Sequence, residues 1–429
     1  MPLLFAFVIL LVFLALSLHV AATLGILGLT LDHLFSRFPL YQAIGEITWD
    51  ASTDFVLLAI PLFVMLGEIL LKSGIADKVY GALDSWLSWL PGGMLHANIG
   101  TSAMFSATSG SSVATAATIS TVALPQARKY GYNESFFAGS IAAGGTLGIL
   151  IPPSINLIIY GVLTNTSIPQ LFMAGIVPGI MLMVIFMLFI LVACLIWPQL
   201  GSSSRKSLKK STWQYRFSSL KHFLPVLFIF FIVIGTIYAG FATPTESAAL
   251  GVLGAIALAA CYGKFRLRFF VEVIEGTMRT TAMIMLIIIA AKFLNFILTS
   301  IGLTGMLSGF LDTLGLSPLA TLMVIITIYI VLGFFIETLS LMVITIPIVT
   351  PIIVGMGHDP VWFGILLILL IEMALITPPV GLNLYVVQGI RQRGDIGEVM
   401  VGSLPFVVMI FLMIVILIIY PDLTRILIP

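Results

Sequence analysis

The sequence predicts an all-α polytopic membrane protein made of two inverted repeats, each with five spans and one re-entrant hairpin. Three observations predict this fold. Sixty per cent of the 429 residues are hydrophobic and only 9% are charged, a balance that a water-soluble chain would not tolerate. Runs of about twenty apolar residues, enough to cross roughly 30 Å of hydrocarbon, recur along the chain. A motif with two adjacent prolines occurs twice, at Pro152-Pro153 and at Pro378-Pro379.

The apolar runs predict the membrane spans in order. They lie at about 2–18, 20–36, 52–72, 134–163, 172–198, 222–240, 246–262, 277–298, 360–390 and 400–422. The first run lacks the basic residues that open a signal peptide, so we expect a retained span. Two further segments, 93–127 and 318–354, are interrupted near their centres by small polar or acidic residues. These two segments are predicted to be re-entrant hairpins that enter and leave the membrane on the same side.

Clustered basic residues predict the orientation. A polar linker at 201–221 carries Arg205, Lys206, Lys209, Lys210, Arg216 and Lys221. The positive-inside rule places this linker in the cytoplasm. Counting spans from it brings the other basic clusters to the same side, namely Arg128, Lys129, Lys264, Arg266, Arg268, Arg391 and Arg393. Both termini are then predicted to be periplasmic or extracellular.

A shift of 226 residues superposes the two double prolines and also places Pro125 on Pro351. The chain therefore contains an internal repeat. Because each copy crosses the membrane an odd number of times, the second copy must be inverted relative to the first. Inverted repeats with helices broken at matching positions are typical of secondary transporters that bind their substrate near the membrane midplane.

The double prolines free backbone carbonyl groups inside the membrane, because proline lacks an N–H and blocks the preceding helical turn. Such groups are tolerated only where protein or a water-filled cavity surrounds them. A bound cation could satisfy them; alternatively, the prolines are simple kinks whose freed groups are capped by Ser or Thr. Asn156 and Asn383 follow the two pairs, which favours a binding site.

The centre of the first hairpin is rich in small polar residues around Gly110. These are Ser102, Ser106, Thr108, Ser109, Ser111, Ser112 and Thr115. Close packing of membrane helices explains part of this pattern. A helix–turn–helix tip would also expose carbonyl groups that suit a small hard cation and amide groups that suit a carboxylate.

The second hairpin and the predicted spans at 277–298 and 360–390 place charged residues at membrane depth. Glu337 lies at the second tip beside Thr338 and Ser340, and Glu372 precedes the second double proline. Ionisable residues at this depth indicate function by default. Glu337 could instead cap the second arm, and any of Glu337, Glu372, Lys292 and Asn295 could pair with another of them only to hold the bundle together.

Two helix caps are predicted elsewhere in the chain. Thr245 is predicted to cap the helix that starts near 246, and Asp50 and Asp54 could cap the span at 52–72.

Other classes of function are disfavoured. A net charge of +1 argues against a nucleic-acid partner. No HExxH pattern, other metal signature or P-loop occurs in the sequence. An ion channel could use re-entrant loops, but two unequal tips suit one asymmetric binding site better than a ring of identical filters. An intramembrane enzyme is the least favoured reading because no catalytic pair is evident.

Four motifs in order carry a family resemblance. They are SATSGSSVATAAT at 106–118, GTLGILIPPS at 145–154, ATPTESAA at 242–249 and ITPPVGLNLYV at 376–386. Together they resemble the large membrane subunit of tripartite ATP-independent periplasmic (TRAP) transporters, over essentially the whole chain. The resemblance implies no enzymatic activity. It implies sodium-driven uptake of an organic acid, of the sialic acid or C4-dicarboxylate type, across the bacterial inner membrane.

The resemblance also implies partners and an elevator mechanism. A periplasmic binding protein would deliver the substrate, and a separate small four-helix subunit would widen the scaffold in the lipid bilayer. The implied parts are scaffold helices at 1–72 and 172–262, transport-domain segments at 93–163 and 318–390, a helix and arm at 277–317, and a last span at 400–429. At least two sodium ions are implied, at Ser102, Ser106, Gly145, Gly148 and Pro152, and at Gly333, Thr338, Thr377 and Pro378. The substrate would lie near Ser111, Ser112, Asn156 and Asn383.

Overall fold

The computed structural model describes residues 18–201, 213–263, 266–303 and 315–428, with a few isolated positions outside these ranges. All regular elements in the described part are helices. The predicted span at 2–18 lies almost entirely outside the described residues. Four basic residues of the linker, Arg205, Lys206, Lys209 and Lys210, also lie outside them, as does Lys264.

The helices follow the chain as two similar series. The first series is α2 (Val20–Phe35), α3 (Ile44–Thr53), α4 (Ala59–Ser73), α5 (Ile75–Leu87), α6 (Met94–Ser109), α7 (Ser112–Lys129), α8 (Glu134–Leu150), α9 (Ile155–Thr164) and α10 (Ile168–Ile196). The second is α11 (Trp213–Ser219), α12 (Leu224–Tyr238), α13 (Pro244–Cys261), α14 (Leu267–Ser300), α16 (Pro318–Gly333), α17 (Thr338–Gly355), α18 (Pro360–Leu375), α19 (Leu382–Arg391) and α20 (Ile396–Ile419). Short 3₁₀ turns such as η2 (Phe55–Leu58) join some of them.

The helical predictions are confirmed for the described spans, and two helices were missed. Six described helices are long and apolar enough to cross a membrane, or eight if each bent pair counts as one span. The missed helices, α3 and α5, have 10 and 13 residues and carry several charges each. They are too short and too polar to stand out in a search for runs of about twenty apolar residues.

The helix boundaries repeat with the predicted shift of 226 residues. This shift carries Ser112–Lys129 of α7 onto Thr338–Gly355 of α17 without an offset, and α8 and α9 onto α18 and α19 within one residue. Both double prolines interrupt the helix at the same place, and both Pro–Pro bonds are cis. The copies differ where α3 and α4 of the first correspond to the single helix α14 of the second. Asp54 marks that break, because its side chain accepts a hydrogen bond from the Val56 N–H and starts η2.

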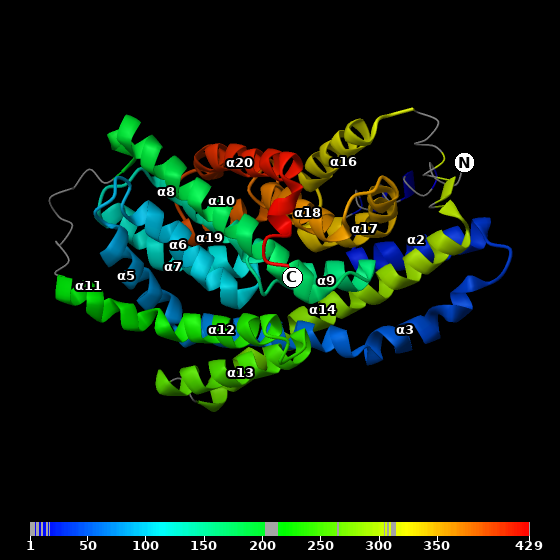
Figure 1. The fold of residues 1–429 in the computed structure, drawn as a ribbon, viewed down its shortest axis with the longest axis horizontal. Helices are drawn as coiled ribbons and strands as arrows, with labels where there is room; N and C mark the ends of the chain where they lie inside the picture. Colours follow the sequence, from blue (N-terminus) through cyan, green and yellow to red (C-terminus); the bar gives the residue numbers. More distant parts are fainter. Residues whose placement is uncertain are drawn as a thin grey trace.

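The helices form an elongated bundle with two sides (Figure 1). Helices α3, α12 and α13 run along one long side. There α13 packs against α4 and α12, and α14 packs against α2 and α4. On the other side, α8 is the central helix and packs against α6, α7 and α20. Each segment that follows a break packs against helices of the other copy: α9 packs against α17, and α19 packs against α7 and α8. This exchange brings the two broken helices together in the middle of the bundle.

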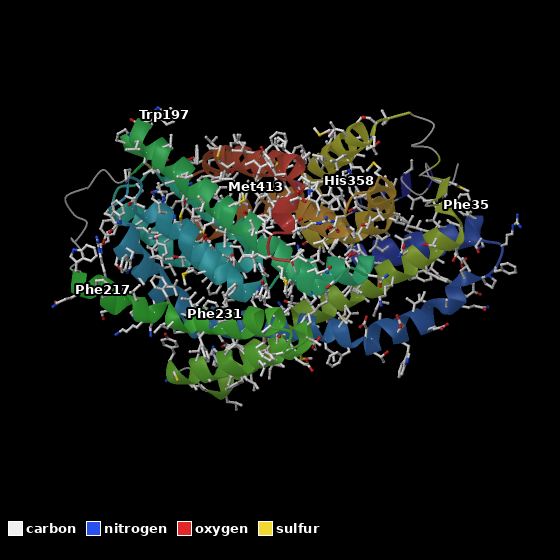
Figure 2. The ribbon with its side chains drawn as sticks, in the orientation of Figure 1. Phe35, Trp197, Phe217, Phe231, His358 and Met413 are labelled. Atoms are coloured by element: carbon white, nitrogen blue, oxygen red, sulfur yellow. The ribbon has the colours of Figure 1, made fainter. Side chains whose placement is uncertain are left out.

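Large apolar side chains cover much of the outer surface. Phe217, Phe231 and Trp197, which are labelled in Figure 2, are exposed. In contrast, every residue of α8 from Phe136 to Leu150 is buried. An apolar exterior around a tightly packed centre is what a lipid-facing bundle requires.

Two predicted caps are corrected by the structure. Thr243, not Thr245, caps α13: its hydroxyl accepts from the Glu246 N–H, while Glu246 accepts from the Thr243 N–H at 2.8 Å. Pro244 follows at the first helical position, where a missing N–H costs nothing. Asp50 caps no span, because it lies inside α3. Asp54 does cap the segment that leads into α4, as predicted.

An ion-pair cluster ties the end of the second broken helix to the first copy. The Arg391 side chain, 4% exposed, donates to Glu134 at 2.9 Å and to Glu398. Arg128 also pairs with Glu134, at 3.4 Å. Helices α7, α8, α19 and α20 therefore share one charged cluster.

Removing the Arg391 guanidinium should destabilise the bundle, because Glu398 would lose its partner and Glu134 would keep only the more distant Arg128. We expect Arg391→Gln to lower the free energy of unfolding by about 2–3 kcal/mol, less than for a fully buried pair because both glutamates are partly exposed. Thermal unfolding of the purified protein measures the effect. The matched control is Arg393→Gln, an exposed arginine two residues away, and an equal effect of both variants would contradict the role of the cluster.

Candidate functional site

The tip of the first hairpin is a tight turn between α6 and α7. Gly110 adopts a positive φ of 61°, which ends α6 and reverses the chain. Ser111 then caps α7, with its hydroxyl accepting from the Ala114 N–H. The Ser/Gly composition thus forms the predicted helix–turn–helix tip, and α7 begins at this tip.

The first tip packs directly on the first broken helix through glycines. A Cβ on Gly148 would lie 2.8 Å from the Ser111 carbonyl oxygen, and one on Gly145 would lie 3.2 Å from that of Ser112. The Ser112 hydroxyl donates to the Thr146 carbonyl at 3.3 Å. Only glycine at these positions of α8 allows so close an approach, and the approach places backbone carbonyl groups of the tip beside the helix that breaks at Pro152.

The tip of the second hairpin is built differently. Glu337 caps α17 and accepts hydrogen bonds from the N–H and hydroxyl of Ser340, at 3.1 and 2.9 Å. Gly333 packs against Ala374 of α18, where a Cβ would lie 2.5 Å from the alanine methyl group. The alternative prediction that Glu337 caps the second arm is therefore confirmed.

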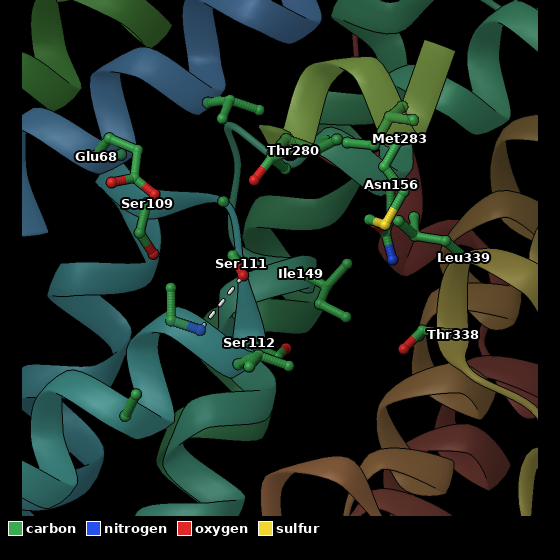
Figure 3. Close-up of a pocket in the computed structure, with 18 of the residues that line it drawn as sticks. Glu68, Ser109, Ser111, Ser112, Ile149, Asn156, Thr280, Met283, Thr338 and Leu339 are labelled. Carbon is green, nitrogen blue, oxygen red and sulfur yellow. Dashed lines mark hydrogen bonds between the residues drawn. The ribbon is translucent and has the colours of Figure 1, made fainter. Parts of the chain in front are cut away.

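A cavity of about 340 Å³ lies between the two tips. Ser111 and Ser112 line it from the first tip, Asn156 from α9, and Thr338 and Leu339 from the second tip (Figure 3). Glu68 of α4 and Thr280 and Met283 of α14 close it from the other side of the bundle. Three of the four residues predicted to bind substrate are thus brought together with one predicted ion ligand.

The electrostatics of this cavity come from helix ends. Its described lining residues include Glu68 and Glu337 but no Lys, Arg or His. Three helices begin there, α7 after Ser111, α9 after Ser154 and α17 after Glu337. The free N–H groups and the positive dipole end of a helix N-terminus attract anions. The starts of α7 and α9 therefore favour a carboxylate without a basic side chain, whereas the start of α17 already holds the Glu337 carboxylate.

Several buried polar atoms around the first tip lack a hydrogen-bond partner among the described residues. They include the Ser102 hydroxyl, the Asn383 side-chain oxygen and the Asn156 amide nitrogen. Ser106 differs, because its hydroxyl donates to the Ser102 carbonyl at 2.5 Å. Unpartnered buried oxygens are costly unless something binds them. The oxygens of Ser102 and Asn383 are therefore candidates for ligand contacts.

A second small cavity lies behind the second tip. It has about 10 Å³, roughly what one water molecule or one small ion needs. Gly333, Glu337 and Thr338 line it together with Ala374 and Gly381. The predicted ligands Thr377 and Pro378 do not line it. The Thr377 hydroxyl donates instead to the Met373 carbonyl, one turn back in α18.

The remaining candidates lie elsewhere. Asn383 is fully buried against α8 and donates to the Ala142 carbonyl at 3.2 Å, so it does not line the cavity between the tips. Lys292 pairs with Asp50 at 3.3 Å and with Asp54 at 3.8 Å, so it links α14 to α3 and to the start of η2. Asn295 and Lys292 line a separate cavity near Asp54. Glu372 lines neither cavity at the tips.

Sequence reasoning missed the residues that close the cavity from α4 and α14. Glu68, Thr280 and Met283 stand in ordinary apolar or amphipathic runs and carry no motif. One feature of the sequence does indicate Glu68 as a candidate, because it is an acidic residue inside a predicted span.

The fold is that of a known membrane transporter. It matches the crystal structure of the YdaH transporter of Alcanivorax borkumensis with a TM-score of 0.62 at 17% identity, covering 100% of both chains.

Sequence comparison then gives the family. Residues 7–423 match the model of the tripartite ATP-independent periplasmic transporter, DctM component. The chain is 33% identical to the sialic acid TRAP transporter large permease protein SiaM of Vibrio cholerae over 91% of this chain and 89% of SiaM. It is also 33% identical to the C4-dicarboxylate TRAP transporter large permease protein DctM of Pseudomonas aeruginosa, over 92% and 91%. This chain therefore belongs to the family of large membrane subunits of TRAP transporters, which are permeases rather than enzymes.

Proposed function

We propose that this chain is the permease of a sodium-driven system that imports an organic acid across the bacterial inner membrane. The names of its relatives support a substrate of the sialic acid or C4-dicarboxylate type. A periplasmic binding protein would deliver the acid, and a separate small four-helix subunit would complete the membrane part. Both termini would be periplasmic.

The observation that carries this proposal is the cavity between the tips. It is lined by Ser111, Ser112 and Asn156, and three helices begin at its wall. An organic acid has a carboxylate for the helix N-termini and hydroxyl or carbonyl groups for the Ser and Asn side chains. The Glu337 carboxylate at the wall favours a co-bound cation over an anion alone, whereas Glu68 already pairs with Lys72 at 3.2 Å.

Two sodium ions are proposed beside this cavity. One would lie between the first tip and α8, with Ser102 and the unpartnered oxygen of Asn383 as side-chain ligands. Ser106, Gly145, Gly148 and Pro152 would frame the same site from the two helices. The other would lie in the small cavity at Gly333 and Thr338, with Thr377 and Pro378 in the adjacent break.

An elevator motion of inverted repeats fits the division of the bundle. The hairpins and broken helices at 93–163 and 318–390 would move as the transport domain against scaffold helices at 1–72 and 172–262. The cavity has walls from both parts, since Glu68 of the scaffold lines it together with the two tips. Thr280 follows a stretch of α14 whose charged residues Glu272, Glu275 and Arg279 are exposed, as expected at the cytoplasmic end. The structure would then represent an inward-facing state.

Reconstitution tests the proposal. We expect liposomes that contain this chain and the small subunit to accumulate the ligand of the binding protein when an inward sodium gradient is applied. Ser102→Ala and Thr338→Ala should each raise the sodium concentration for half-maximal uptake about tenfold, because a bond from an oxygen to a charged group contributes roughly 1.5 kcal/mol.

The matched control is Thr327→Ala, since the Thr327 side chain is exposed on α16 and bonds only to the Met323 carbonyl one turn back. Equal uptake with potassium in place of sodium would rule out sodium coupling. A normal sodium response of both tip variants would instead contradict only the placement of the ions.

A further inference from the structure

Glu372 is a buried acid that the proposed transport site does not use. It lies on α18 and is 0% exposed. At 1.5 Å per residue it stands roughly 18 Å along the helix from Pro360, close to the middle of a bilayer. Its neighbours in α18, from Ile368 to Ile371 and from Met373 to Leu375, are buried and apolar.

No counter-charge is available to this carboxyl group among the described residues. It forms no salt bridge, and neither of its oxygens has a hydrogen bond of good geometry. Its carboxyl group lies close to the backbone of Leu150, the last residue of α8 before the first double proline.

None of the ionisable groups on the described elements packed against α18 offers Glu372 an unpaired positive charge. They are Glu134, Tyr160, Cys194, Tyr329, Tyr385, Arg391, Glu398 and Asp422. Glu134, Arg391 and Glu398 pair with one another. Tyr160 donates to the Pro360 carbonyl and Tyr329 to the Thr345 hydroxyl. Each group that could carry a positive charge near α18 is thus already paired away from Glu372.

An ionised carboxylate in such a place is costly, and three things can remove the cost: a basic partner, a bound metal cation or a proton. The structure offers no basic partner. A sodium ion needs several further oxygen ligands, whereas apolar side chains surround this carboxyl group. We propose that Glu372 is a proton-binding site, with its carboxyl group neutral where α18 packs against the end of α8. The proton is taken up from water when this contact closes and is returned to water if the contact opens.

The consequence is a pH-sensitive contact beside the first helix break. Ionising Glu372 would place a charge next to Leu150 and favour water between α8 and α18, which pack together here. The neutral form keeps the two broken helices packed. This inference concerns the bundle itself and stands whether or not sodium drives transport.

The test compares glutamine variants of two glutamates in the purified complex of this chain with the small subunit. Glutamine has nearly the shape of a neutral glutamic acid but cannot ionise. We expect Glu372→Gln to unfold at or above the wild-type temperature at both about pH 6 and about pH 9, because glutamine cannot carry the charge that this buried position disfavours. Its uptake rate should stay within about twofold of wild type. The matched control, Glu134→Gln, removes an ionised partner of Arg391 and should lower the unfolding temperature at both pH values.

Infrared spectroscopy gives a direct readout that does not depend on transport. Near neutral pH the wild-type protein should show a C=O stretching band of a protonated carboxyl group that is missing from Glu372→Gln. The proposal is overturned if this band is absent, or if Glu372→Gln lowers the unfolding temperature as much as Glu134→Gln does. It is also overturned if Glu372→Gln abolishes sodium-dependent uptake, because the charged carboxylate would then be needed as a cation ligand.

Discussion

Asn156→Leu should raise the KM for organic-acid uptake by roughly 10- to 100-fold while leaving the protein folded. Asn156 is 5% exposed, lines the cavity between the tips, and its amide nitrogen has no hydrogen-bond partner among the described residues. A hydrogen bond to a charged ligand contributes about 1.5–3 kcal/mol, which corresponds to this change in affinity. Leucine has a similar volume, so the packing of α9 should survive.

The unfolding temperature separates binding from structure in this experiment. It should stay at or above the wild-type value, because leucine removes a buried polar group that has no protein partner. Uptake kinetics of Asn295→Leu provide the control, since Asn295 lines the separate cavity near Asp54. If Asn156→Leu kept the wild-type KM, the substrate could not lie against this side chain.

Gly402→Val should prevent stable folding. Helices α8 and α20 touch through their backbones here: a Cβ on Gly402 would overlap the Ser135 carbonyl group, and one on Gly139 would overlap the carbonyl of Gly402. Overpacking against flexible side chains typically costs 1–3 kcal/mol. Because the clashing atoms belong to backbone that is held by helical hydrogen bonds, we expect a cost above about 3 kcal/mol.

The control for this prediction is Gly235→Val in α12. A Cβ on Gly235 would meet nothing within 4 Å, so only the helix propensity changes. We expect a wild-type yield of this variant from membranes and a large loss for Gly402→Val, as measured by size-exclusion chromatography in detergent. Similar yields of the two variants would show that α8 and α20 separate more easily than their backbone contact implies.

The broken helices and the first tip could be predicted from the sequence because their causes are local. Pro152-Pro153 must interrupt any helix, and Gly110 among serines favours a turn. The same local chemistry made Glu337 recognisable as a cap. In each case a few neighbouring residues set the backbone conformation, so the prediction does not depend on how the helices pack.

The missed features depend on segments far apart in the chain. Glu68 and Thr280 reach the cavity only because α4 and α14 pack beside the tips. The sequence pattern groups Asn383 with Asn156 because both follow a double proline. The exchange of α9 and α19 places Asn156 at the cavity and Asn383 against α8. Helix α13 is capped by Thr243, two residues before the predicted Thr245, because Pro244 suits the first position of the helix.

By itself, the sequence determined that this chain is an apolar helical bundle with a repeated, twice-broken centre. Apolar length and proline positions act through the solvent and the backbone of each segment alone. Only the tertiary structure decided which polar groups face the cavity, which are paired and which stay buried without a partner. These outcomes depend on how closely the helices approach one another. Glycine contacts such as those of Gly148 and Gly402 set this approach, and they join segments whose sequences do not indicate that they touch.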